Sequence, residues 1–163
     1  MISESIKTQS KQIFQNIDYI FNVINSENIN NKIGVFPIWK QIYHLLHSID
    51  QNFIDPSNFI EPDFHKKNLN VIFIDSNELL TKDQLFQYYQ NVREKIELYL
   101  SSLTEDKLNE IIMFREMKLT KMELILSQFR HIFYHIGYLH CCFKLLNGET
   151  PEYIGLYKVI PEK

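Results

Sequence analysis

Two histidines that are four residues apart, His131 and His135, give this sequence its clearest chemical potential. They lie in a long segment whose apolar residues recur at helical spacing, and a separation of four residues places two side chains on the same side of an α-helix, one turn apart. Two imidazoles in this arrangement can bind one metal ion. The spacing is HxxxH and not HExxH, so the motif supplies no glutamate as a general base.

A second pair, His44 and His47, lies in an earlier segment of helical pattern. If the two segments pack side by side, a three-histidine site results, which leaves metal positions open for water or substrate. On a helical wheel His47 lies nearer than His44 to the apolar side, so the wheel slightly favours His47 as the third ligand. The alternative is structural: both residues are polar groups on a helix face, or hydrogen-bond a backbone carbonyl.

Two other candidate ligands on the later helix, His140 and Cys142, are not expected to bind the same ion as His131 and His135. His140 lies on the opposite flank of that helix, and Cys142 lies about 10 Å further along its axis at roughly 1.5 Å per residue. The two cysteines, Cys141 and Cys142, are adjacent and are expected to be free thiols. Free thiols and a polar N-terminus without a hydrophobic signal region predict a cytoplasmic protein.

Size and composition limit the class of protein. The chain has 163 residues, which predicts a single domain over 1–163, and 45% of them are hydrophobic, enough for one sizeable core. The net charge is −3, which gives no basic surface for nucleic acid or anionic lipid. No apolar run approaches the ~18 residues that span a bilayer. We therefore expect no nucleic-acid partner and no membrane.

Four amphipathic helices are predicted, over 3–26, 37–53, 81–100 and 120–147. The third and fourth begin with the form of a capping box, at Thr81 and Thr120, and the fourth ends before Gly148. Residues 56–75 read as irregular, with 71–74 as either a short strand or a packed loop. Residues 104–109 read as a helical turn, and the stretch up to 119 is ambiguous. The pattern predicts an all-α, up-down-up-down four-helix bundle.

The sequence resembles the DinB-like superfamily of four-helix bundles, which includes YfiT-type metal hydrolases and thiol-dependent transferases. The similarity covers nearly the whole chain and is carried by ordered segments. These are Gly34-Val35-Phe36-Pro37-Ile38-Trp39, Tyr43-His44-Leu45-Leu46 with Asp50, Val92-Arg93-Glu94-Lys95, Leu103-Thr104-Glu105-Asp106, and Met122-Glu123-Leu124-Ile125-Leu126 with Arg130, His131, His135 and Gly137.

The resemblance implies a DinB/YfiT-like metalloenzyme fold with a divalent metal, Zn or Ni, on one second-helix histidine and the later pair. Register against the positions of Gly34, Tyr43 and Asp50 selects His44, whereas counting from Trp39 selects His47. The predicted metal ligands are therefore His44, His131 and His135. Whether His47 replaces or joins His44 stays open. The sequence differs from the pattern at Tyr138 and His140, so substrate contacts from that turn are not carried over.

Two functions follow as hypotheses. The first is a metal-dependent thiol transferase or hydrolase, in which the ion activates a low-molecular-weight thiol or water against a small-molecule substrate. Thiol transfer is slightly favoured by the resemblance, which also suggests a homodimer, and no catalytic residue beyond the ligands is identified. The alternative is a non-catalytic binding or interaction bundle with a structural or vestigial metal site. The first hypothesis fails if the imidazoles of the two helices do not converge.

Overall fold

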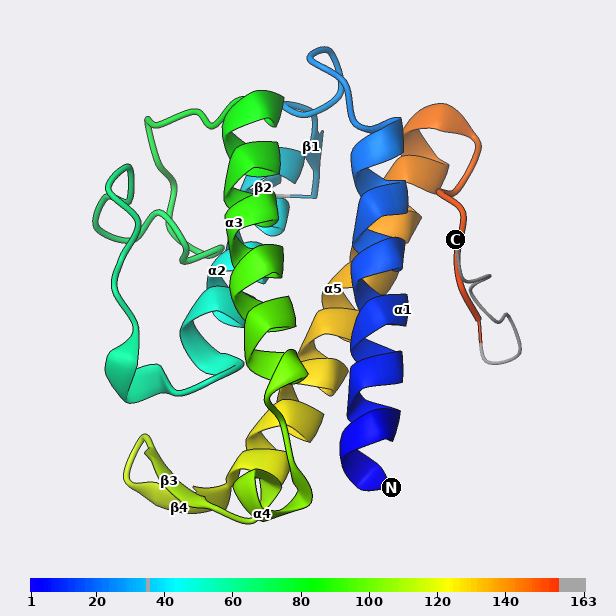
Figure 1. Ribbon diagram of the computed structural model, residues 1–163. Helices are drawn as coiled ribbons and strands as arrows, with labels where there is room; N and C mark the ends of the chain where they lie inside the picture. The colour runs from blue at the N-terminus through cyan, green and yellow to red at the C-terminus, as the bar shows by residue number, and fades with distance from the viewer. Residues whose placement is uncertain (35, 156–163) are drawn as a thin grey trace.

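Four long helices form the framework of the protein. The computed structural model describes residues 1–34 and 36–155, so Val35 in the first segment of the family resemblance and the end of the predicted 1–163 domain lie outside the described residues. Helices α1 and α2 each pack against both α3 and α5 (Figure 1). The predicted all-α four-helix bundle is confirmed. The helices are α1 (Ile2–Val23), α2 (Ile38–Asn52), α3 (Lys82–Ser101) and α5 (Lys121–Asn147), with the short α4 (Glu105–Leu108) before α5.

The ends of the helices follow local sequence signals. Thr81 and Thr120 each cap a helix through the predicted capping box, in which the threonine hydroxyl accepts from the backbone N–H of Gln84 or Glu123 and their side chains accept in return. Helix α5 ends at Gly148, whose φ of 76° is the left-handed conformation that glycine adopts without steric cost. These caps fix the start of the helix that carries His131 and His135.

The directions of the helices differ from the predicted up-down-up-down order. Helices α2 and α3 run the same way, so the order is up-down-down-up (Figure 1). Lys82, at the start of α3, donates to the carbonyl of Ile24 just beyond α1, whereas Lys95, further along α3, donates to Asp50 near the end of α2. The reason is the long connection of residues 53–81, because only a short connection forces consecutive helices to be antiparallel.

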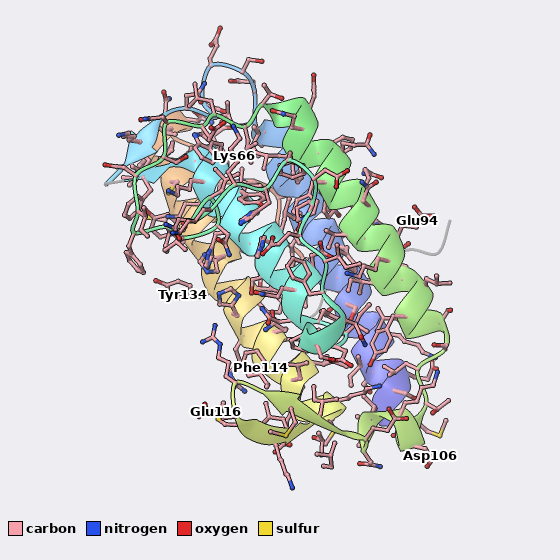
Figure 2. All side chains as sticks on the ribbon, turned by 90° about the vertical axis from the view of Figure 1, so that its left-hand side faces the viewer. Lys66, Glu94, Asp106, Phe114, Glu116 and Tyr134 are labelled. Carbon is pink, nitrogen blue, oxygen red and sulfur yellow. The ribbon has the colours of Figure 1, made fainter. Side chains whose placement is uncertain are left out.

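This α2–α3 connection runs along the outer side of α2 (Figures 1 and 2). It contains one short 3-10 helix, η1 (Pro56–Asn58), and residues 71–74 form a turn and no strand. The ambiguous stretch before α5 is a hairpin of β3 (Ile111–Phe114) and β4 (Met117–Thr120), paired antiparallel. A smaller hairpin, β1 (Lys32–Ile33) with β2 (Phe36–Pro37), precedes α2.

One hydrophobic core unites the four helices. Trp39 and Leu46 of α2, Tyr89 of α3, and Ile132 and Ile136 of α5 are all buried in it. Ile132 and Ile136 alternate along α5 with the two histidines of the sequence motif, so burial of the apolar pair fixes the direction in which the histidines project. No helix among the described residues is long and apolar enough to cross a membrane.

Candidate metal centre

The three predicted ligands meet where α2 packs against α5. Nε2 of His131 lies 3.1 Å from Nε2 of His135, and the ring of His44 lies 4.7 Å from that of His135, centroid to centroid. One nitrogen from each ring falls within 4.8 Å of the others. We call this group the three-histidine site. The structure therefore brings together residues that are far apart in sequence.

Hydrogen bonds behind the rings orient two of the three imidazoles. Nδ1 of His44 lies 2.7 Å from the carbonyl oxygen of Asn70. A carbonyl only accepts, so this nitrogen carries the proton and Nε2 keeps its lone pair for the site. Nδ1 of His131 lies 3.2 Å from Oγ of Ser48, whose hydroxyl donates onward to Gln128. Metal-binding histidines characteristically donate their second N–H in this way.

The donor set fits a divalent ion. Two nitrogens bound to one tetrahedral zinc lie roughly 3.3 Å apart, given Zn–N distances of about 2.0–2.1 Å, and the observed separation between His131 and His135 is 3.1 Å. Nδ1 of His135 is buried and has no hydrogen-bond partner within the described part of the chain. Imidazoles suit zinc and nickel, whereas calcium and magnesium prefer oxygen ligands.

Burial disfavours the protonated form of the two site histidines on α5. It lowers the pKa of His131, with a further contribution from His44. Burial, together with His44 and His131, lowers the pKa of His135 to about 3. The desolvated interior and the neighbouring imidazoles both disfavour a positive charge. The imidazoles of His131 and His135 are therefore neutral at pH 7, which is the form that binds metal.

The three-histidine site opens into a pocket of about 430 Å³, here called the site pocket. Its walls come from α2, from α5, from the α2–α3 connection and from the tip of the β3–β4 hairpin. Figure 2 shows Tyr134 on α5 above the hairpin tip with Phe114 and Glu116. A small molecule can thus approach the imidazoles from outside the bundle. Besides the three ligands, the lining consists of His47, Ser48, Gln51, Asn52, Asn70, Val71, Ile72, Phe73, Arg115 and Tyr134.

His44, and not His47, lies with the pair on α5. His47 is the more buried of the two, with 2% of its surface exposed, and its Nε2 donates to Glu61 at 2.7 Å. The helical wheel therefore identified the more buried histidine, but the α2–α3 connection supplies it with a different partner. His140 lies in a separate pocket beside Tyr153, and Cys142 is buried in the core, so both are outside the site, as predicted.

Several residues of the site were not predicted. Ser48 lies four residues after His44 on α2, a spacing that offered a usable signal for a shared face. Asn70 and Arg115 come from segments without regular periodicity, and nothing in their sequence indicates where they lie. Glu61 and His65, which lie beside His47 and outside the three-histidine site, likewise belong to the irregular connection. About half of the residues that line the pocket besides the ligands thus come from segments outside the helices.

Comparison with known proteins supports the fold. The chain is similar to a DinB-like protein, YjoA, from Bacillus subtilis, whose crystal structure it matches with a TM-score of 0.58 and 18% sequence identity over 93% of this chain and 96% of that one. No model of a known protein family matches the chain, and neither does any curated protein. The likeness confirms that the chain has the fold of a DinB-like protein, in agreement with the resemblance found in its sequence.

Proposed function

We propose that this chain is a DinB-like metal-dependent enzyme whose ion, zinc or nickel, is held by His44, His131 and His135. The observation that carries the proposal is the convergence of three imidazoles on an open pocket, two of them oriented by hydrogen bonds from behind. A divalent ion in such a site lowers the pKa of a bound thiol or water toward neutrality. Three protein ligands leave a coordination position for that group.

The composition of the site pocket favours a thiol over water. Within the described residues, its lining contains no aspartate or glutamate, so no carboxylate is in place as a general base. A carboxylate is one of the groups that enzymes use to remove a proton from water during hydrolysis. A thiol that loses its single proton on binding becomes a nucleophile without further assistance. We therefore place transfer of a low-molecular-weight thiol to an electrophile ahead of hydrolysis.

Arg115 indicates the class of electrophile. It lines the site pocket and makes no ion pair with any described residue. It sits at the tip of the β3–β4 hairpin, where Arg115 and Glu116 have φ values of 46° and 69°, a turn conformation that normally selects glycine or asparagine. Strained turns are often retained where they position a functional group. We propose a small substrate with an anionic group, which Arg115 would bind.

Metal analysis combined with turnover tests the proposal. Purified wild-type protein should retain a divalent metal and should join small thiols to 1-chloro-2,4-dinitrobenzene, whereas His131→Ala/His135→Ala should lose that metal and the activity together. His140→Ala is the matched control, since His140 is a half-buried histidine of the same helix outside the site pocket. Hydrolysis of p-nitrophenyl acetate in place of thiol transfer would select the hydrolase.

The alternative is a non-catalytic bundle with a structural or vestigial metal site. It would be selected if the double variant changed neither metal content nor any activity. The homodimer and the cytoplasmic location remain predictions, and light scattering of the purified chain tests the first of them.

A further inference from the structure

A second group of metal-ligand side chains lies on the outer side of α2. Nε2 of His47 is 2.7 Å from Oε2 of Glu61, and Nδ1 of His65 is 3.6 Å from the same oxygen. One donor atom of each residue falls within 4.8 Å of the others. We call these three residues the His47 cluster. None of them belongs to the three-histidine site.

We propose that the His47 cluster is a second divalent-cation site, which binds zinc and fastens the α2–α3 connection to α2. Two imidazoles and one carboxylate form a donor set that proteins use for zinc and for iron(II). With neutral imidazoles the set carries one negative charge, which a divalent cation more than compensates. Glu61 and His65 come from the connection and His47 from the helix, so a shared ion would join the two segments.

The hydrogen bonds of His47 show how a cation would enter. The side-chain amide of Asn70 donates to Nδ1 of His47 at 3.2 Å, so Nε2 carries the ring proton and donates it to Glu61. A cation between Nε2 and the carboxylate takes the place of that proton, which moves to Nδ1. The amide of Asn70 can present its oxygen to Nδ1–H after rotating by about 180°, since one end of an amide donates and the other accepts. The ring itself need not move.

A separate pocket gives a cation access to this cluster. Glu61 is 48% exposed and lines a cavity of about 430 Å³ together with Asp50 and Asp63. Among the residues that the structure describes, Lys95 is the one basic residue in that lining, and it is paired with Asp50 at 2.6 Å. The carboxylates of Glu61 and Asp63 therefore leave the entrance negative. Such an entrance attracts cations.

Asn70 links the His47 cluster to the three-histidine site. Its carbonyl oxygen accepts from His44 and its side-chain amide contacts His47. A cation in the cluster would thus hold in place the residue that orients a ligand of the other site. This coupling rests on the proposed function, whereas cation binding by the cluster does not. The competing interpretation is a hydrogen-bonded network alone, in which the Tyr43 hydroxyl, 2.6 Å from Nδ1 of His65, completes the group.

Calorimetric titration of the demetallated full chain with ZnCl₂ tests the proposal. Glu61→Gln keeps the shape of the side chain and an oxygen that accepts from His47, so it preserves the fold while removing the charge. Glu78→Gln is the matched control, because Glu78 is a glutamate of the same connection with 44% exposure and an ion pair to Lys66. Wild type and Glu78→Gln should bind two equivalents of zinc. In Glu61→Gln one of them should weaken by more than about tenfold.

Limited trypsin digestion supplies a second measurement. Lys66 and Lys67 are exposed residues next to His65 in the connection. Zinc should slow cleavage after these lysines in wild type and in His131→Ala/His135→Ala, but not in Glu61→Gln. Protection in the double variant would support the cluster even if the three-histidine site binds nothing. Identical zinc stoichiometry, affinity and protection in wild type and Glu61→Gln would overturn the proposal.

Discussion

The three-histidine site and the His47 cluster each include one histidine of α2, and they differ in the groups that their imidazoles contact. In the three-histidine site the rings face one another, a serine hydroxyl and a backbone carbonyl, and no charged group of the described residues makes a hydrogen bond to them. In the His47 cluster, one turn further along α2, the imidazole of His47 contacts the carboxylate of Glu61 and the amide of Asn70. The first group consists of imidazoles alone, and the second pairs its imidazoles with a carboxylate.

This difference bears on how tightly each group would bind a cation. Among the described residues, an ion at the three-histidine site would displace the hydrogen bond between Nε2 of His131 and Nε2 of His135, and Nδ1 of His135 has no partner to lose. Both ring nitrogens of His47 are already satisfied, so a cation there must replace good hydrogen bonds. We expect the three-histidine site to be the tighter of the two, and the His47 cluster to respond more to free zinc concentration.

The largest expected effect separates His44 from His47. His44→Ala should weaken zinc binding at the three-histidine site by more than about 100-fold, since loss of a group behind the ligands alone costs roughly 10- to 100-fold. His47→Ala should change affinity at that site by less than about tenfold. Competition with a chromophoric chelator measures both. Equal losses in the two variants would show that the histidines act as one site and would remove the distinction drawn above.

Acid should destabilise the metal-free protein through the three-histidine site. The pKa of His135 falls from 6.5 to about 3 on folding, so the unfolded chain binds more protons between these values. Stability from this residue is complete above pH 6.5 and is lost as the pH falls toward 3. Between pH 6.5 and 5 the free energy of unfolding should decrease by about 2 kcal/mol.

Urea unfolding across that pH range provides the measurement. His135→Gln removes the titrating group and should flatten the dependence. His140→Ala tests whether the effect belongs to the site, because burial lowers the pKa of His140 as well, but outside the site pocket. A wild-type curve that stays flat from pH 7 to 5 would contradict the assignment of a buried, neutral His135.

Removal of the support behind His131 should have a smaller effect. Ser48→Ala deletes the hydroxyl that accepts from Nδ1 of His131 at 3.2 Å and should weaken zinc binding about tenfold. Ser127→Ala is the control, because its hydroxyl donates to the carbonyl of Leu124 within α5 and, among the described residues, makes no hydrogen bond to the three histidines. Calorimetry with ZnCl₂ measures the two affinities. A loss of the same size in both variants would indicate a general effect of serine removal.

Sequence patterns identified the helices and the paired candidate ligands because both obey short-range rules. The threonine caps at Thr81 and Thr120 and the four-residue spacing of His131 and His135 each depend on one helix alone. The direction of α3 cannot be predicted from that helix alone. It depends on the end of the bundle to which the α2–α3 connection returns the chain. The choice of His44 over His47 also required the register of the family resemblance, because the wheel measures burial and not the identity of a partner.

Short-range sequence rules do not predict where the loops of the two histidine groups lie. Asn70, Glu61 and His65 occur in a stretch without periodicity, and each acquires its role only when the connection folds onto α2. Arg115 reaches the site pocket through a two-residue hairpin turn, in a segment whose strands were ambiguous in sequence. These contacts join segments that are far apart in the chain and have no repeating pattern. The local sequence therefore does not predict them.

The smallest expected effect concerns the opposite charges of the two pockets. Arg115 makes the site pocket attractive to anions, whereas Glu61 and Asp63 make the other pocket attractive to cations. Arg115→Gln should raise KM for a carboxylate-bearing electrophile roughly three- to tenfold, a modest change because the side chain is exposed and screened by solvent. KM for a neutral electrophile should stay unchanged, as should kcat for both.

Arg130→Gln is the matched control for this last prediction, since Arg130 is an exposed arginine on α5 outside the lining of the site pocket. Steady-state kinetics at low and high salt measure the contrast. Loss of charge at Arg115 alone should also reduce the salt dependence of KM for the charged substrate, because screening acts on that one contact. If both arginine variants raise KM equally, net charge governs substrate capture, and the hairpin tip has no specific part in recognition.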